Sequence, residues 1–230
     1  MNVLILGAGL MQIPAILSAK ELGYRVCLVD ADDKAIAISK ADEFRKIDLK
    51  DKEGILQYAK FLQNGSGLAA VFTAGTDFSA SVSYVCQKLN LPSHTFDAAL
   101  NASIKTRMRK CFSDANVPSP KFFNLDKDNF TQDKLKEISS LIGFPLVVKP
   151  VDNMGARGCR MVRSLKEFEP AVKIAIEVSR SGNAIVEEYM DGPEYSIDAL
   201  VYNGTFTVTG FALRHIKYPP YFIETGHTMP

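Results

Sequence analysis

A lysine followed by a glycine-containing loop is the segment best suited to phosphate chemistry. Lys149 ends the apolar run Leu146 to Lys149, and the loop Asn153 to Gly158 follows it. Such a lysine presents one fixed positive charge, and the loop can turn several backbone N–H groups toward a polyphosphate. The spacing is not that of a P-loop, because no Gly-Lys-Ser/Thr follows. The segment therefore predicts a phosphate clamp, with a surface lysine beside an ordinary glycine hairpin as the alternative.

A second candidate is an acidic strand end. The apolar run Ala184 to Val186 leads into Glu187, Glu188, Tyr189 and Met190, and Glu194 follows a turn at Asp191-Gly192. Backbone groups at such a strand end can pair with a purine edge, while a carboxylate accepts hydrogen bonds from ribose hydroxyls. The alternative is a rim of solvated acids, since charged strand ends usually face water.

A third candidate is the turn Gly7-Ala8-Gly9, which follows the first apolar run. Asp30 ends the next apolar run, where a dinucleotide-binding protein holds ribose. Gln12 stands in place of the third glycine, and its side chain would crowd the contact between helix and strand. We therefore expect a turn that determines the fold, and an NAD- or flavin-dependent oxidoreductase using Gly7, Gly9 and Asp30 is the less favoured alternative.

The first ninety residues predict a doubly wound parallel sheet. Apolar runs Val3 to Leu6, Val26 to Val29 and Ala69 to Phe72 alternate with stretches of helical periodicity, which is the pattern of βαβ units. Asp51 is a plausible N-cap for the second helix. The residues expected to face the sheet are Ile13, Ile16 and Leu17, then Ile55, Ala59 and Leu62, then Val82, Val85, Cys86 and Leu89.

Leu91-Pro92 predicts a domain boundary, and His94 beside it is expected to be a loop residue rather than a base. A helix over residues 103–115 then places Lys105 and Arg109 one turn apart, so that the two cations can act together.

An α+β unit is expected after Val117-Pro118. One of its helices has Leu135, Ile138, Leu141 and Ile142 as its apolar face. The other begins at the capping box Ser164 to Glu167 and turns Phe168, Ala171, Val172, Ala175 and Ile176 inward.

An antiparallel sheet is predicted to begin near residue 194. Residues 194–202 alternate strictly, and Asn203-Gly204 supplies a two-residue hairpin turn into residues 205–213. Residues 214–230, which include His215 and His227, show no defined pattern.

Composition limits the classes of partner. There are 27 Lys and Arg against 26 Asp and Glu, a net charge of +1, so no general field attracts nucleic acid or anionic lipid. The four cysteines form no CxxC pair, which suits free thiols in a reducing compartment. No window approaches the ~18 apolar residues of a membrane span, and no basic segment begins the chain. We expect a cytoplasmic protein without nucleic-acid or membrane partners.

Taken in order, these segments resemble the ATP-grasp superfamily. The resemblance rests on Lys105 with Arg109, Val117-Pro118-x-Pro120, Lys149-Pro150 with its loop, and the stretch from Glu187 to Glu194. The resemblance covers essentially all 230 residues. Among members of the superfamily, the sequence is similar to biotin carboxylase, the carbamoyl-phosphate synthase large subunit and the carboxylate–amine ligases. It implies a pre-ATP-grasp domain (1–96), a connecting helix (97–117), a lid (118–190) and an incomplete core (191–230).

The resemblance also implies roles for individual residues. Lys105, Lys149 and the loop would contact ATP phosphates, Glu187 through Met190 would lie against adenine, and Glu194 would bind ribose. The implied cofactor-binding residues are Lys105, Lys149, Asn153, Met154, Gly155, Ala156, Arg157, Gly158, Glu187, Glu188, Tyr189, Met190 and Glu194. The implied substrate residues are Gly7, Gly9, Gly75, Thr76, Asp77 and His227, although Gly75 to Asp77 can equally cap the next helix.

The activity implied by the resemblance is ATP-dependent ligation. ATP would phosphorylate a carboxylate, and an amine or similar nucleophile would displace the phosphate, with Mg²⁺ spanning the ATP phosphates. The magnesium ligands of the superfamily would lie beyond Pro230, and neither Asp198 nor Glu224 matches their motif. We therefore expect small-molecule carboxylate and amine substrates but no turnover by this chain alone. A homodimer is compatible with the sequence, and a nucleotide-binding regulatory or scaffold protein is the alternative function.

Overall fold

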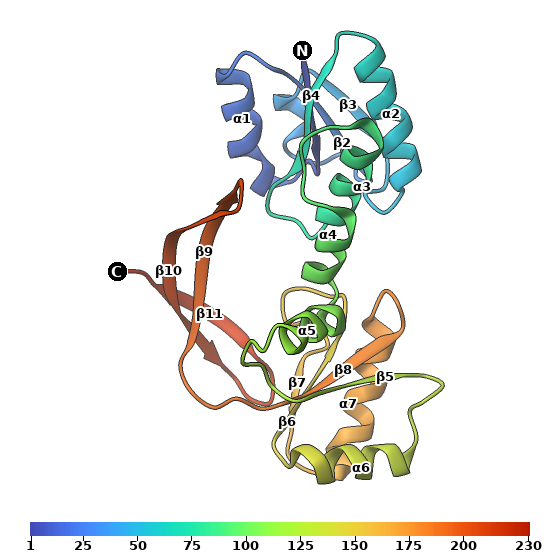
Figure 1. Cartoon of the computed structure of the whole chain (residues 1–230), viewed down its shortest axis with the longest axis vertical. Coiled ribbons are helices and arrows are strands. Elements are labelled where there is room, and N and C mark those ends of the chain that lie inside the picture. Colours follow the sequence, from blue (N-terminus) through green and yellow to red (C-terminus); the bar gives the residue numbers. More distant parts are fainter. The chain divides into compact units, whose positions relative to one another are not determined.

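The computed structural model describes all 230 residues and divides into two compact units, Met1–Ser103 and Ile104–Pro230 (Figure 1). The expected mixture of α/β and α+β architecture is confirmed, because the first unit contains a parallel sheet and the second contains two antiparallel sheets. No helix combines the length and the apolar character required to cross a membrane.

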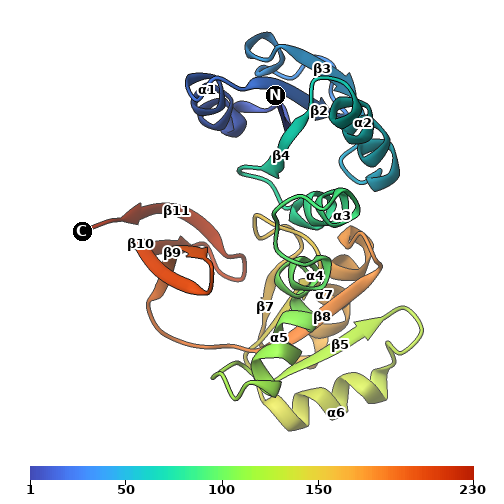
Figure 2. The same ribbon diagram turned by 45° about the horizontal axis from the view of Figure 1, so that its top comes forward.

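The first unit is built on four parallel strands in the order β3-β2-β1-β4. The strands are β1 (Asn2–Leu6), β2 (Arg25–Asp30), β3 (Glu43–Lys46) and β4 (Leu68–Thr73). Alternate residues of β1 enter different cores: Val3 and Ile5 pack on the side of α1 (Ile13–Glu21), and Leu4 and Leu6 on the side of α2 (Lys52–Asn64) and α3 (Ser79–Leu89). Figure 2 shows α1 and α2 on opposite faces of this sheet.

The predicted helices of this unit are confirmed in most details. The Asp51 carboxylate accepts a hydrogen bond from Gly54 N at 2.9 Å and so caps α2. Leu17 is the exception, because it is 46% exposed and not part of the core. The strand β3 was not predicted, since Phe44 is its only apolar residue. Short 3₁₀ segments, η1 (Leu10–Gln12) and η2 (Ile38–Lys40), complete the unit with α4 (Phe96–Ser103).

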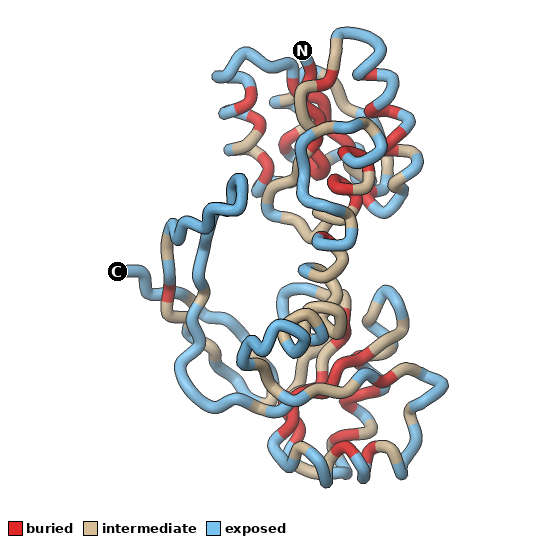
Figure 3. The backbone as a smooth tube through the Cα atoms, in the orientation of Figure 1, coloured by how far each residue is buried: buried red, intermediate tan, exposed pale blue.

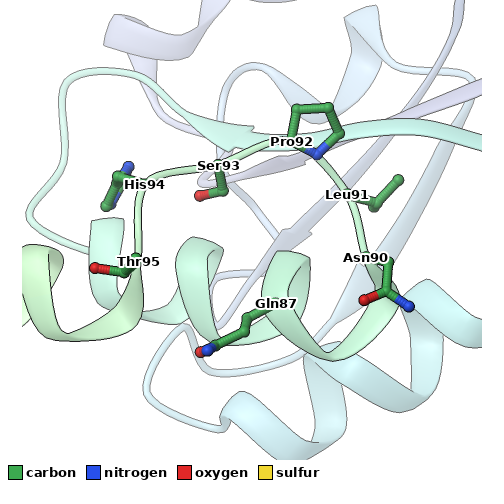
Figure 4. Close-up of a pocket in the computed structure, with 7 residues that line it drawn as sticks. All are labelled: Gln87, Asn90, Leu91, Pro92, Ser93, His94 and Thr95. Atoms are coloured by element: carbon green, nitrogen blue, oxygen red, sulfur yellow. The ribbon is translucent and has the colours of Figure 1, made fainter. Parts of the chain in front are cut away.

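A pocket of about 470 Å³ lies where α3 turns toward α4 (Figure 4). It is lined by residues 87 and 90–95, which include His94 in the loop after Pro92. The lining contains neither a lysine nor an arginine nor a carboxylate. The pocket therefore has no fixed charge with which to bind a phosphate or a carboxylate substrate.

The second unit contains a four-stranded antiparallel sheet in the order β5-β8-β6-β7. Its strands are β5 (Phe122–Asp126), β6 (Leu146–Pro150), β7 (Arg160–Val162) and β8 (Asn183–Glu188), and its helices are α5 (Lys105–Asp114), α6 (Gln132–Ile142) and α7 (Leu165–Val178). Phe168, Leu135 and Ile138 fill the core between α6, α7 and one face of this sheet.

Two predictions for these helices are wrong. Leu141 is 54% exposed, because it lies off the face of α6 that enters the core. The capping box does not form either: the Ser164 side chain makes no cap hydrogen bond, and the Glu167 carboxylate accepts from Arg163 N at 2.9 Å instead.

The chain ends in a three-stranded antiparallel sheet, β11-β10-β9. The strands β9 (Glu194–Tyr202) and β10 (Thr205–Lys217) are joined by the predicted two-residue turn, in which Asn203 and Gly204 have φ of 46° and 76°. Residues 223–228, where no pattern was recognised, form β11 (Ile223–Thr228). Most residues of β9 are exposed (Figure 3).

The core of the second unit gives a direct stability prediction. Phe168 is fully buried, so Phe168→Ala is expected to lower the free energy of unfolding by about 3–5 kcal/mol through lost apolar contacts and a new cavity. Leu165→Ala on the same helix is the control, because Leu165 is 42% exposed and its loss is expected to cost under about 1 kcal/mol. Urea titrations measure both values, and equal costs would contradict the assigned core.

Candidate functional site

A buried carboxylate with two cationic partners lies at the centre of the second unit. The Glu187 side chain on β8 is 4% exposed, and its Oε1 accepts from Arg109 Nε at 2.7 Å. Its Oε2 forms an ion pair with Lys149 Nζ. Each carboxylate oxygen therefore has its own cation, as a buried charge requires.

Strand register explains why Lys149 and Glu187 meet. Val147 lies opposite Glu187, and Lys149 lies opposite Ile185, so Lys149 and Glu187 are diagonal neighbours on one face of the sheet. Residues on the other face, such as Val148 and Val186, enter the core with α6 and α7. The ion cluster therefore lies on the face away from those helices, where α5 contributes Arg109.

The two acids predicted as a pair have different environments. Glu187 is buried, so the alternative of a solvated acidic rim is wrong for this residue. Glu188 points to the opposite face and is exposed, and its carboxylate accepts from Lys121 N at 3.3 Å. Only Glu187 therefore belongs to the cluster.

Lys105 connects α5 to the start of the glycine-containing loop. Its Nζ donates to Asn153 O at 2.7 Å and lies 3.5 Å from Val151 O, and its backbone N donates to Val151 O at 3.0 Å. Lys105 and Arg109 are one turn apart, but they hold different groups: Lys105 binds loop carbonyls and Arg109 binds Glu187.

Charge is concentrated at this site. Burial raises the pKa of Glu187, but the Arg109 hydrogen bond and the Lys149 charge outweigh burial and leave this pKa below its usual value. Burial and, secondarily, the Lys149 charge lower the pKa of Lys105. Three cations, Lys105, Arg109 and Lys149, thus lie near two carboxylates, Glu187 and Asp152, which leaves a local excess of one positive charge. The cluster can attract an anion without any general basic surface.

The loop after Lys149 is anchored at its first residues. The Asp152 carboxylate accepts from the backbone N of Arg180 and Ser181 at 3.0 and 2.8 Å, and the Asn153 side chain donates to Val178 O at 2.8 Å. These three bonds tie the loop to the end of α7 and the residues just after it. The side chains of Asp152 and Asn153 therefore hold the start of the loop in place.

The tip of the loop has left-handed backbone at three positions. Gly155, Ala156 and Gly158 have φ of 67°, 55° and 73°. Met154 is 54% exposed, and Arg157 Nε donates to Met154 O at 3.2 Å within the loop. Backbone N–H groups in a turn of this kind can point toward a bound anion and form a concavity for it.

The segment after β8 leads to a second cluster on the three-stranded sheet. Tyr189 packs on Phe222 with ring centroids 6.4 Å apart, and Met190 is 67% exposed. Glu194 pairs with Arg214, and Arg214 Nη2 lies 2.5 Å from Glu224 Oε2. His227 also pairs with Glu224.

Arg214 was not singled out from the sequence, although it lies on β10 directly opposite Glu194 on β9. The Cys159 thiol lies near charged residues of both clusters. Burial raises the pKa of this thiol to about 11, and the charges of Lys149, Glu187 and Glu194 make smaller contributions. The thiol is therefore protonated at neutral pH.

The backbone N–H groups of the glycine turn in the first unit donate to side chains of the same unit. Ala8 N donates to Asp30 Oδ2 and Gly9 N to Gln12 Oε1, both at 2.8 Å, and Gln12 Nε2 donates to Ala74 O. A dinucleotide needs the turn's N–H groups for pyrophosphate and the acid for ribose. Since this chain uses both internally, the oxidoreductase alternative loses its geometric basis.

The other predicted substrate residues of this unit also support the turn. Gly75 has φ of 63°, and a Cβ there would lie 2.6 Å from Met11 Cβ. The Thr76 hydroxyl lies 2.8 Å from Thr73 Oγ1 and accepts from Phe78 N at 3.3 Å, just before α3. The roles of Gly7, Gly9, Gly75, Thr76, Asp77 and His227 toward a substrate remain predictions.

A comparison with models of known families gives a match in the C-terminal part of the chain. Residues 142–230 match the family model described as the ATP-grasp domain. Together with the antiparallel sheet and the ion cluster, this match confirms the resemblance to the ATP-grasp superfamily inferred from the motifs.

The chain is also similar to individual known proteins. The chain is 24% identical to the carbamoyl phosphate synthase large chain of Caldanaerobacter subterraneus subsp. tengcongensis, across 94% of this chain and 21% of that protein. The L-amino acid ligase of Bacillus licheniformis superposes with a TM-score of 0.78 at 22% identity, over 100% of this chain and 55% of that one.

A third comparison is with the biotin carboxylase domain dimer of Hydrogenobacter thermophilus 2-oxoglutarate carboxylase, solved with MgADP, ADP and bicarbonate. Its TM-score is 0.75 at 21% identity, over 94% of this chain and 50% of that one. The chain thus spans only about half of these two solved structures and a smaller part of the synthase.

The loop geometry predicts unequal effects of two matched substitutions. Alanine at Gly155 or Gly158 is strained by about 1 kcal/mol, because both glycines have positive φ. A Cβ on Gly158 would also lie 2.5 Å from Val178 Cγ2, whereas Gly155 has open space. Gly158→Ala is therefore expected to lower the free energy of unfolding by about 2–3 kcal/mol and Gly155→Ala by about 1 kcal/mol.

Thermal and urea unfolding of both variants measure this difference. Val178→Ala is the companion change, because it removes the methyl group that the new Cβ would meet. It should recover part of the loss in Gly158→Ala and none in Gly155→Ala. Equal destabilisation by the two glycine variants would show that the loop does not pack on Val178 as described.

Proposed function

We propose that this chain carries the ATP-binding part of a ligase that joins a small carboxylate to an amine. The observation that supports this most strongly is the buried Glu187 carboxylate paired with Arg109 and Lys149, beside Lys105 and the loop Asn153 to Gly158. The excess positive charge of these residues suits a polyphosphate. The match to the ATP-grasp domain and the ligases among its structural neighbours support the same assignment.

The residues present fit a nucleotide. Lys149 and Lys105 would hold the phosphates as point charges, and the left-handed loop would turn its N–H groups toward them. Backbone groups from Glu187 to Met190 would contact the adenine edge, and Glu194 would accept from ribose once it leaves Arg214. Glu188, Tyr189, Met154, Ala156 and Arg157 are proposed to border the same site.

The chemistry proposed for the whole protein is carboxylate activation. When bound, ATP supplies the γ-phosphoryl group: a carboxylate oxygen forms a bond to phosphorus, the β–γ bond breaks, and ADP leaves. An amine then attacks the acyl phosphate, and inorganic phosphate and a proton are released. The contribution of this chain is to hold and orient the phosphates and to exclude water beneath the loop.

No group of three or more His, Cys, Asp or Glu side chains is arranged to hold a metal ion. Magnesium enters the proposal because the related biotin carboxylase domain was solved with MgADP. We assign it no ligand here and propose that the 230-residue chain binds nucleotide without completing ligation, since it spans about half of the neighbouring structures.

The acceptor substrates belong to the same proposal. Small carboxylate and amine molecules are proposed because the solved neighbours include an L-amino acid ligase. Glu224 and His227 on β11 are the residues of the second unit proposed to border them. A cytoplasmic location and a homodimer complete the proposal, the latter because the related carboxylase domain is described as a dimer.

The nucleotide site predicts selective loss of binding. Lys149→Met and Lys105→Met are each expected to weaken binding of a non-hydrolysable ATP analogue with Mg²⁺ by about tenfold or more, since each removes one charge from the phosphates. Calorimetric titration measures the affinities. Lys110→Met is the matched control, because Lys110 lies on α5 with Lys105 but is 73% exposed and pairs with Asp114.

The control should bind as the wild type does, and unfolding curves should show that all three variants are folded. Absence of wild-type binding would contradict the proposed function. An equal loss in Lys110→Met would instead indicate a general electrostatic effect rather than a defined site. Binding by the full-length protein without magnesium-dependent hydrolysis would favour a regulatory role.

A further inference from the structure

The lysine proposed to bind phosphate already has a partner. Lys149 Nζ pairs with Glu187 Oε2, and its side chain is 20% exposed. Arg109 and Lys149 each pair with one oxygen of the Glu187 carboxylate, so neither oxygen lacks a partner. A phosphate that binds Lys149 therefore draws on the same ammonium group as Glu187, and the two anions must divide its three N–H donors and its single charge between them.

If Lys149 were the only cation beside Glu187, its departure to a phosphate would leave a buried carboxylate without an ion-pair partner. The Glu187 side chain is 4% exposed, and a buried ion left without a partner is strongly unfavourable. Arg109 removes this difficulty, because its Nε is 2.7 Å from the other oxygen and its guanidinium stays charged. With Arg109 in place, Glu187 keeps one cation when Lys149 turns to a phosphate.

We propose that Arg109 is a positioning residue that holds the Glu187 carboxylate and thereby lets Lys149 exchange between Glu187 and a nucleotide phosphate. The inference rests on the proposed nucleotide site and adds a role for a residue that touches no substrate. Arg109 lies on α5, Glu187 on β8 and Lys149 on β6, so the exchange couples three elements of the second unit.

Other charged groups face the same carboxylate. Besides Arg109 and Lys149, the neighbours are Lys105 from α5 and the Cys159 thiol from the segment before β7, whose pKa responds to Glu187. Lys105 is held by the loop carbonyls, and the thiol is neutral, so neither can take the place of Arg109 as a hydrogen-bond donor to Oε1. Phe122 on β5, opposite Glu187, carries no charge.

Proton linkage provides the test. In Arg109→Met, the carboxylate would lose its last cation when Lys149 binds phosphate, and the pKa of Glu187 would rise on nucleotide binding. A group whose pKa rises on binding takes up a proton, so affinity must increase as pH falls. We expect Arg109→Met to bind the ATP analogue about tenfold more weakly than wild type at pH 8 and to recover most of that loss near pH 6.

Calorimetry of the full chain in buffers of different ionisation enthalpy measures the protons taken up. The wild-type chain and Lys110→Met report the uptake due to the analogue itself, and Arg109→Met should exceed it. Arg109→Lys should return the uptake to the wild-type value, because a cation is restored. The double variant Arg109→Met/Glu187→Gln should also lose the excess uptake, because no carboxylate remains to be protonated.

The outcomes separate this inference from the proposed function. If the wild-type chain binds no nucleotide at any pH, both are overturned. If it binds and Arg109→Met has wild-type affinity and proton uptake, only the positioning role is overturned. If Arg109→Met does not fold, Arg109→Lys and the double variant decide, because a weakened, pH-dependent affinity in the double variant would refute the role of Glu187.

Discussion

The carboxylate of Glu187 is the constraint on which the geometry of the second unit depends. A buried charge must have partners, and here they come from α5 and β6. Fixing Arg109 over the sheet also fixes the rest of α5, so Lys105 one turn earlier reaches the carbonyls at the start of the loop. A single buried ion therefore sets the position of a helix, and that helix sets the position of a second cation.

The strands β6 and β8 have two faces with opposite properties. Val148 and Val186 point into an apolar core closed by α6 and α7, while Lys149 and Glu187 point away from it. Because the core is close-packed, the strand backbones that bear the charges are rigid. A preorganised arrangement of this kind needs little rearrangement when an anion binds, apart from the exchange of Lys149 between its partners.

Much of the fold was predictable because its elements have strong local patterns. The alternation of apolar runs and helical stretches gave the parallel sheet, and Asp51 marked the start of α2. The failures lie where local pattern is weak. The edge strand β3 has a single apolar side chain, and β11 carries polar residues at most positions, so both depend on pairing with a neighbouring strand. Leu17 and Leu141 are apolar, yet tertiary packing leaves them exposed.

The candidate site shows the same division between local and tertiary information. Lys149 and Glu187 could be chosen from the sequence because each ends an apolar run, but their pairing depends on strand register. Arg109 was expected to act with Lys105 because the two lie one turn apart, whereas its partner Glu187 lies 78 residues away in sequence. A helix face predicts only that two cations are neighbours. Which anion each cation binds is decided by the sheet beneath, and so the function of Arg109 is a property of the fold rather than of its motif.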